Sequence, residues 1–334
     1  MLNKLLNIKY PIIQGAMANI ATAEFAACVS QCGGLGIIAT GSLSAEQTRI
    51  EIQKCKQLTN QPFGVNIMLM NPYASEIVDV IIEEGVPVVT TGAGNPGAYM
   101  AKFKEAGIKV FPVVPSVGLA KRMERAGADA LIVEGGESGG HVGEMTTMAL
   151  VPQVVDAVNI PVIAAGGIAD GRGMIAAFAL GACGVQVGTC LLVADECPIH
   201  ENYKEAVIKA KDTDTVVTGK SVNTPVRSLK NQMTREYLKL ESHIESREEL
   251  EKLTWATLTK AVHDGDVHLE QSAVRRYHHD LLSAAGYVRN RRYSEGVWRI
   301  WKQDCCVDRA DAGTQCRTWQ DQSGYEDQQR AERS

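Results

Sequence analysis

The sequence predicts an α/β fold and, within that class, a (β/α)8 TIM barrel. Eight short apolar runs lie between Pro11 and Thr189, and an amphipathic stretch separates each run from the next. The runs are almost continuously apolar rather than alternating, which is typical of parallel strands buried on both faces. Several amphipathic stretches end in glycine, the residue that commonly terminates a helix. An open doubly wound sheet is the alternative arrangement of the same elements.

The predicted strands are rich in valine and isoleucine and are bounded by glycine or polar residues. In chain order they are 12–15, 35–39, 63–67, 86–90, 109–113, 130–134, 161–165 and 184–188. The helices expected between them are 21–31, 44–58, 74–84, 98–106, 117–126, 147–158 and 171–180. Strict alternation of strand and helix favours the closed barrel.

After the eighth predicted strand the alternation stops. The following segment is charged, and we expect a small helical insertion with helices at 201–211, 226–240 and 246–262. An insertion at the end of the last barrel strand lies beside the mouth where active sites of this fold are built. We therefore expect residues 1–196 to form the barrel and residues 197–267 to form a helical lid or substrate subdomain.

Composition excludes several classes of protein. The chain has 334 residues, 39 acidic and 34 basic, with 45% apolar residues and a formal charge of −5. These values differ from those of disordered chains and of most nucleic-acid-binding proteins. No uncharged apolar run reaches the ~18 residues of a spanning helix, and the first residues do not form a signal-peptide pattern. Nine cysteines in this length are no disulfide framework, so we expect a cytoplasmic protein with no membrane or nucleic-acid partner.

The densest chemical signal is the glycine-rich segment 134–143, in which five of ten residues are glycine and which contains His141. It follows the sixth predicted strand, so it belongs at the catalytic face of a barrel. Glycines let a backbone approach a flat ligand, and a histidine in such a loop can donate a proton or a hydrogen bond. A solvated histidine on a flexible loop is the alternative.

Two further glycine-rich turns follow the seventh and eighth strands, at 164–171 and 186–189. Backbone N–H groups at these positions, with a short helix N-terminus, form the usual phosphate site of a TIM barrel. The segment 92–97 also fits the G-x-G-x-x-G pattern, but no acidic residue ends the next strand, so we do not interpret it as a dinucleotide site. Cys183, Cys190 and Cys197 lack the spacing of a zinc site, and we expect no metal.

Five strings together make the chain resemble the FMN-dependent barrel family of nitronate monooxygenases (2-nitropropane dioxygenase-like) and type II enoyl-acyl carrier protein reductases. They are PIIQGAM (11–17), FGVN (63–66), ESGGH (137–141), AAGGI (164–168) and QVGT (186–189). Within the family, ADEC (194–197), NYK (202–204), PVRSLKN (225–231) and TREYL (234–238) look more like the reductase branch. The resemblance covers about residues 1–267.

The resemblance implies FMN at the barrel mouth and His141 as the catalytic candidate. The residues that it implies beside the flavin ring or ribityl chain are Gly15, Ala16, Met17, Asn66, Thr91, Gly92, Ala93, Gly94, Gly139 and Gly140. The residues that it implies at the phosphate are Gly166, Gly167, Gln186, Gly188 and Thr189.

The implied reaction is reduction of a trans-2-enoyl thioester on acyl carrier protein, as in fatty-acid elongation, with NADH or NADPH as co-substrate. Oxidation of alkyl nitronates with FMN and oxygen is the first alternative. A non-redox phosphate-binding barrel is the second. Oligomeric state stays open, with a homodimer as one possibility.

Residues 268–334 differ abruptly in composition from the rest of the chain. They contain 10 of the arginines but one lysine, three of the four tryptophans and no proline. We interpret them as an anomalous tail that is either a frameshifted translation or a disordered segment. A lineage-specific extension and a helical tail for a partner are the alternatives.

Overall fold

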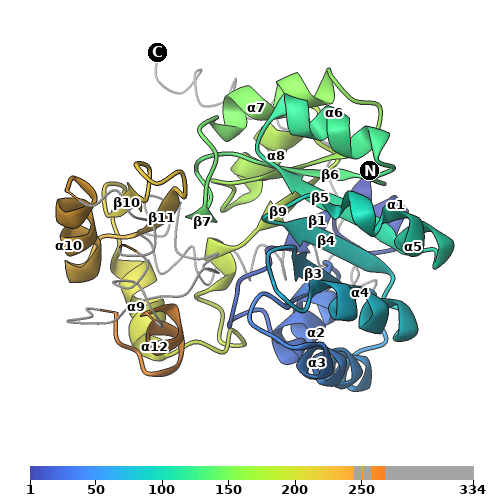
Figure 1. Cartoon of the computed structure of the whole chain (residues 1–334), viewed down its shortest axis with the longest axis horizontal. Helices are drawn as coiled ribbons and strands as arrows, with labels where there is room; N and C mark the ends of the chain where they lie inside the picture. The colour runs from blue at the N-terminus through green and yellow to red at the C-terminus, as the bar shows by residue number, and fades with distance from the viewer. Residues whose placement is uncertain (244–249, 251–256, 268–334) are drawn as a thin grey trace, which may run out of the picture. The chain divides into compact units, whose positions relative to one another are not determined.

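The computed structural model describes residues 1–243, 250 and 257–267. Eight parallel strands form one sheet in the order β1-β9-β8-β6-β5-β4-β3-β2 (Figure 1). Each predicted strand coincides with one of them, to within two residues at each end. Their bounds are β1 Ile12–Gln14, β2 Gly36–Ala39, β3 Phe63–Met68, β4 Val88–Gly92, β5 Lys109–Val114, β6 Leu131–Glu134, β8 Val162–Ala165 and β9 Gly184–Val187.

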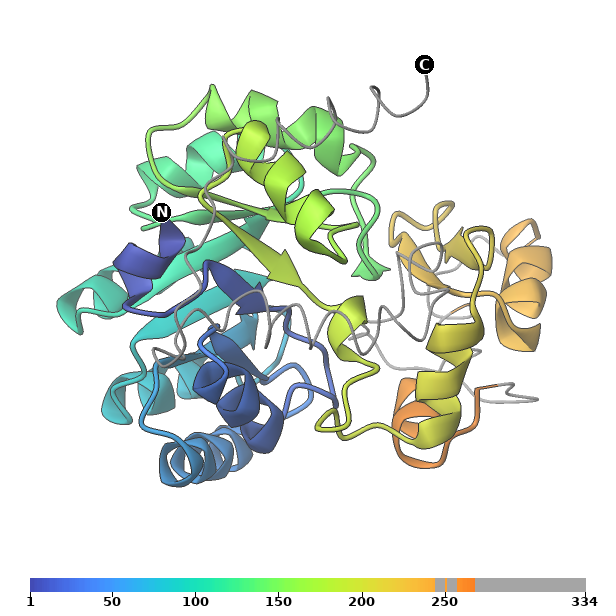
Figure 2. The same cartoon turned by 180° about the vertical axis from the view of Figure 1, so that it is seen from behind.

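The sheet closes on itself where β1 meets the start of β2. Gln14 N donates to Leu35 O at 2.9 Å, and Leu35 N donates to Ile12 O at 2.9 Å. The buried Gln14 side chain adds a third contact, because its Oε1 accepts from Ile37 N at 3.3 Å. Figure 2 shows β9 on the other side of β1. The closed barrel is confirmed, and the open doubly wound sheet is excluded.

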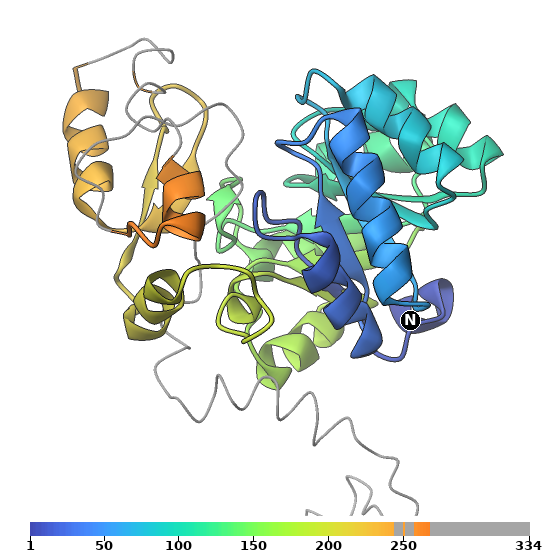
Figure 3. The ribbon, with the colours of Figure 1, turned by 90° about the horizontal axis from the view of Figure 1, so that it is seen from below.

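Helices cover the outer face of the barrel, and Figure 3 shows α2 and α3 side by side on it. Local capping explains where several begin: Ser44 and Gln47 form a capping box at α3, and Thr22 caps α2. The predicted helix at 98–106 is instead a 3-10 turn followed by a short helix. The bounds are α2 Ala23–Gln31, α3 Ala45–Leu58, α4 Ala74–Glu83, η1 Pro96–Ala98, α5 Met100–Glu105, α6 Val117–Arg125, α7 Thr147–Val155 and α8 Gly171–Ala179.

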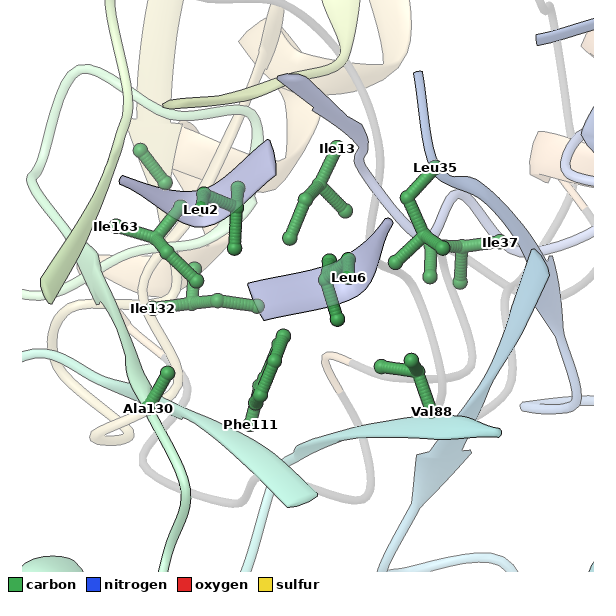
Figure 4. Packing of buried hydrophobic residues seen from close by; sticks show 11 residues of the cluster. Leu2, Leu6, Ile13, Leu35, Ile37, Val88, Phe111, Ala130, Ile132 and Ile163 are labelled. Atoms are coloured by element: carbon green, nitrogen blue, oxygen red, sulfur yellow. The ribbon is translucent and has the colours of Figure 1, made fainter. Parts of the chain in front are cut away.

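The N-terminal half of the barrel is filled by apolar side chains (Figure 4). Helix α1 (Leu2–Leu6) contributes Leu2 and Leu6 to this cluster, together with Ile13, Phe111 and Ile132 from the strands. Leu2 N donates to Cys183 O at 3.0 Å, which fixes the helix against β9. The fully buried apolar layer closes that end of the barrel, so a ligand site is left to the opposite, C-terminal end.

The insertion after β9 contains strands as well as helices. β10 (Thr215–Thr218) pairs antiparallel with β11 (Val226–Leu229), and β11 pairs with β7 (Gly140–His141). The prediction of a helix at 226–240 was wrong over its first residues, because Val226–Leu229 lie between two strand partners. The helix α10 begins only after Asn231, whose side chain accepts from Thr234 N at 2.9 Å. The other elements are η2 Thr189–Leu191, α9 Glu201–Lys209, α10 Gln232–Glu241 and α12 Thr257–His263.

The interpretation of residues 268–334 lies outside the described residues, as does most of the helix predicted at 246–262. Among the helices of the described part, none is long and apolar enough to cross a membrane.

Candidate active site

The inner face of the barrel changes from apolar to polar toward the C-terminal ends of the strands. Side chains alternate along a strand, so the residue two positions after a core residue points the same way. Val88 and Ile132 belong to the apolar cluster. Thr90 lies two positions after Val88, and Glu134 lies two positions after Ile132, so both point to the inside of the barrel. Gln186 is in register with Ile13 and Ala165, and Asn66 is in register with Thr90. These four polar side chains therefore belong to one ring at the mouth.

Asn66 and Thr90 form one side of this ring. Asn66 Nδ2 donates to Thr90 Oγ1 at 2.9 Å, and both residues are buried. The sequence pointed to Asn66 and to Thr91, whereas Thr90 is the residue whose register partners place it inside. The strand at 86–90 was predicted correctly. Because side chains alternate along a strand, counting two residues on from Val88 would have pointed to Thr90.

The segment after β4 has an unusual backbone. Ala93 has a φ of 52° and Gly94 a φ of 158°. A Cβ on Gly94 would lie 2.7 Å from Leu69 Cβ, so a larger residue does not fit. Non-glycine residues rarely adopt positive φ, and such strain is concentrated at ligand sites. The segment Thr91–Gly94 is thus held close to the neighbouring strand end, as expected for a wall beside a ligand.

Glu134 is the acidic member of the ring. It ends β6 and lies across the ladder from Ala165. Burial raises the pKa of its carboxyl to about 7, and the nearby Ser138 side chain offsets part of this effect. The sequence placed Glu134 in the glycine-rich segment without a role. A carboxyl that titrates near neutral pH can hold a proton at the mouth.

His141 lies in β7, which is the edge strand of the insertion's sheet. It is in register with Val226 of β11, and Val142 N donates to Pro225 O at 3.1 Å. The histidine is half-buried. The sequence predicted a flexible or catalytic loop here and gave no signal that residues of the insertion would pair with it.

The same loop is fastened to the barrel at its other end. Gly135 N donates to Ala165 O at 3.0 Å, and Gly136 N donates to Met145 O at 2.7 Å. A Cβ on Gly135 would lie 2.1 Å from Thr147 Oγ1, so only glycine fits there. The close approach explains part of the glycine content of segment 134–143.

The turn after β8 approaches this loop closely. Gly166 and Gly167 have φ of 99° and 72°, values that favour glycine. Thr147 Oγ1 lies within 3.0 Å of Gly166 O, and a Cβ on Gly167 would lie 3.1 Å from Glu137 Cβ. The predicted phosphate turn and the histidine loop are therefore neighbours.

The two helix N-termini near the predicted phosphate site differ. At α8, the carboxylate of Asp170 accepts from Arg172 N and Gly173 N at 3.0 and 3.1 Å, so the chain's own acid occupies this end. At η2, the N-cap residue is Gly188 and no side chain caps the turn. A Cβ on Gly188 would meet only Met17 Sδ, at 3.7 Å. The space beside Gly188 is therefore compatible with a bound phosphate, whereas the first N–H groups of α8 already bond to Asp170.

The segments that follow β1 and β9 also lie next to each other. Gly15 N donates to Val187 O at 2.7 Å, and a Cβ on Gly15 would lie 3.3 Å from the same oxygen. Ala16 is half-buried and Met17 buried behind this turn. Gly15 and Met17 thus lie beside Gly188.

Other sequence signals supply neither a second phosphate site nor a nucleophile among the described residues. The segment 92–97 enters the turn η1, where Asn95 Oδ1 accepts from Gly97 N at 2.9 Å instead of leaving that donor to a phosphate. Burial raises the pKa of the Cys190 and Cys197 thiols to about 12, which makes them poor nucleophiles. Within the described residues, no group of three or more His, Cys, Asp or Glu side chains could hold a metal ion.

Comparison with known families identifies the barrel. The family model described as nitronate monooxygenase matches residues 1–286, which extends past Val267, where the sequence resemblance was expected to end. The chain belongs to the nitronate monooxygenase family. Membership confirms the resemblance drawn from the five strings, and it agrees with the expectation of a flavin-dependent oxidoreductase.

Relatives within this family carry more than one name. A probable nitronate monooxygenase of Staphylococcus saprophyticus is 36% identical over 309 residues, covering 78% of this chain and 87% of its own. The solved structure of FabK from Thermotoga maritima is 46% identical, with a TM-score of 0.82, and the match covers 91% of this chain and 96% of that one. A nitroalkane oxidase from Streptomyces ansochromogenes is 26% identical, with a TM-score of 0.73, 91% of this chain and 99% of its own being covered.

Proposed function

We propose that this family member is an FMN-dependent enoyl-acyl carrier protein reductase that uses NADH or NADPH. The observation that carries the proposal is the 46% identity to FabK, a type II enoyl-acyl carrier protein reductase, over 91% of the chain. The nitroalkane oxidase covers the same share of the chain with 26% identity. A cytoplasmic location and acyl carrier protein as the partner belong to the same proposal.

The residues at the mouth fit FMN. Gly166, Gly167 and Gly188 offer backbone without side chains, and the open space beside Gly188 would accept the phosphate. Thr189 and the half-buried Gln186 would lie beside it. The segments Gly15–Met17 and Thr91–Gly94 would border the flavin, with Asn66 oriented by Thr90. The glycines Gly139 and Gly140 would let the histidine loop approach the ring.

When bound, FMN would accept a hydride from the reduced nicotinamide and supply it to the β-carbon of the enoyl thioester. The chain's own residues would then have two tasks: to stabilise the charge that develops on the thioester oxygen and to provide a proton for the α-carbon. His141 can perform either task, since a half-buried imidazole can donate a hydrogen bond and can transfer a proton.

We propose further that residues 197–267 form one wall of the acyl site. Two contacts support this role. β11 of the insertion pairs with β7, which contains His141. Thr259 of α12 accepts a hydrogen bond from Asn19, in the turn after β1, at 3.4 Å. The insertion thus contacts loops that follow two different strands of the barrel.

Nitronate oxidation is the second candidate, because the matching family model and the Staphylococcus relatives bear that name. The same histidine could remove a proton from a nitroalkane or bind the nitro group of a nitronate. This reaction requires oxygen and does not require a reduced nicotinamide.

One experiment distinguishes the two candidates. The purified protein is reconstituted with FMN, freed of oxygen, and given NADH or NADPH with crotonyl thioester of coenzyme A or of acyl carrier protein. The proposal predicts stoichiometric nicotinamide oxidation and butyryl thioester. Turnover with propyl-2-nitronate and oxygen, together with none on the thioester, would replace it with the second candidate.

A further inference from the structure

The side chain of Arg227 joins two parts of the molecule that are far apart in sequence. Its Nε donates to Gly136 O at 3.0 Å, across 91 residues of chain. Its Nη1 donates to Thr215 Oγ1 at 3.1 Å. Gly136 lies near the start of the loop that contains His141, and Thr215 begins β10. The guanidinium thus connects this loop to the hairpin of β10 and β11.

The backbone of the same residue contacts the loop at a second place. Arg227 is in register with Gly140, and its neighbour Val226 is in register with His141. Gly136 and Gly140 are therefore both held by one residue of β11. A segment with five glycines in ten residues loses much conformational entropy on ordering, so its position depends on such contacts.

The planar guanidinium suits this arrangement. Its donors point in fixed directions, so one side chain can bond to Gly136 O and Thr215 Oγ1 at once. Arg227 is half-buried, and both of its bonds are therefore partly shielded from water. A lysine could approach one of the two acceptors but could not reproduce both directions.

We infer that Arg227 is a positioning residue that holds His141 in place for reaction. The inference rests on the proposed function in that His141 is the group that acts on the substrate. The hairpin of β10 and β11 is then part of the catalytic apparatus, because the histidine loop takes its position from it.

The test uses Arg227→Met and Arg227→Lys in the FMN-loaded enzyme, with Arg235→Met as the matched control, because Arg235 is an exposed arginine on α10. Arg227→Met should slow the step with crotonyl thioester roughly 100-fold, the effect of a misplaced catalytic group. Reduction of the enzyme by NADH should change by less than about twofold, since that step does not use His141. Arg227→Lys should recover part of the loss, and Arg235→Met should resemble the wild type.

A double-mutant cycle with His141→Ala separates positioning from general structure. If Arg227 acts through His141, Arg227→Met has little further effect when the histidine is absent. Equal effects in both backgrounds, or equal slowing of both steps, would overturn the inference. Amide hydrogen exchange over residues 135–143 supplies a readout besides activity: it should accelerate in Arg227→Met and Arg227→Lys and not in Arg235→Met.

Failure of the proposed function has a different signature. In that case the wild type does not turn over the thioester, and the same cycle is measured with propyl-2-nitronate and oxygen. Non-additivity there would support positioning by Arg227 with the other substrate. Additivity with either substrate, or unchanged exchange in the loop, would reject it.

Discussion

The carboxylate of Glu137 bonds to Thr147, ten residues further along the chain. One of its oxygens accepts from Thr147 N at 2.8 Å and from Thr147 Oγ1 at 2.9 Å. Thr147 is the first residue of α7, whose N-cap side chain makes no capping bond. Glu137 thus caps this helix from the histidine loop, and its negative charge suits the N-terminal end of the helix dipole. The same threonine contacts Gly166 O, so one pair joins the loop, the helix and the phosphate turn.

Removal of this carboxylate should destabilise the protein. Glu137→Ala leaves Thr147 N without its acceptor, and hydrogen bonds to charged groups contribute about 2 kcal/mol. We expect a lower free energy of unfolding and weaker retention of FMN, measured by urea denaturation and by flavin release. Glu144→Gln changes an exposed acid of the same loop and serves as the control. An Ala variant as stable as this control would show that the bond is dispensable.

The space beside Gly188 should be needed by the ligand and not by the protein. Gly188→Ala adds a methyl group that would meet only Met17 Sδ at 3.7 Å, so the side chain itself has room. The backbone angles, φ −127° and ψ −75°, are sparsely populated by alanine, so the flavin-free protein should lose about 1 kcal/mol of stability. FMN affinity, measured by fluorescence titration, should fall by roughly 10-fold because the methyl group enters the phosphate space.

The control for this variant is Gly118→Ala, at a helix position with nothing within 4 Å of the added Cβ. It should leave FMN affinity unchanged and stabilise α6 slightly. If FMN affinity is also unchanged in Gly188→Ala, the phosphate does not bind beside the turn after β9.

Stability should fall with rising pH because of Glu134. The pKa of its carboxyl is raised from 4.5 to about 7 by burial. Between these values the folded state keeps the proton while the unfolded state loses it, so the contribution of Glu134 to stability is complete below pH 4.5 and is lost as the pH rises to 7. The difference between the pKa values of Glu134 in the folded and unfolded states corresponds to about 3 kcal/mol of unfolding free energy.

Glu134→Gln removes the ionisation while keeping the shape of the side chain. At pH 8 this variant should be more stable than the wild type, and near pH 4.5 the two should agree, as measured by urea denaturation across the range. Glu144→Gln should follow the wild-type curve. If the free energy of unfolding of Glu134→Gln falls between pH 4.5 and 7 as steeply as that of the wild type, the Glu134 carboxyl does not cause the fall.

Replacement of His141 should separate chemistry from cofactor binding. His141→Ala should retain FMN and slow the step with enoyl thioester by roughly 100-fold or more, the contribution of general acid catalysis. The measurement is rapid mixing of the reduced enzyme with crotonyl thioester. His243→Ala, at an exposed histidine after α10, is the control. If His141→Ala reacts with crotonyl thioester at the wild-type rate, another group donates the proton to the α-carbon.

Local pattern predicted the barrel well because each of its strands is buried on both faces. A run such as Val162–Ala165 is apolar throughout, which no surface strand would tolerate. The strands of the insertion are half-exposed and short, so Val226–Leu229 carried no such signal. The β-branched run Thr215–Thr218 was a strand signal that the helical interpretation of this region passed over.

The candidate site was predicted in part. The sequence pointed to His141 and to the glycine turns at 166–167 and 188–189, which stay predictions, since glycine and histidine stand out in any local pattern. Thr90 and Glu134 were passed over because their importance depends on which face of a strand they occupy. Arg227 belongs to the string 225–231, but the sequence assigned it no role. Its contact with Gly136 spans 91 residues, which no local pattern reveals.

The sequence by itself determined the eight strands, the family and the glycine-rich loops, because burial on both faces and backbone freedom leave local traces in residue type. Only the tertiary structure decided which polar side chains face the interior, that Glu137 caps α7, and that β11 holds the loop of His141. These are contacts between segments distant in the chain. Each depends on register and on the geometry of donor and acceptor, and neither is a property of a short stretch of sequence.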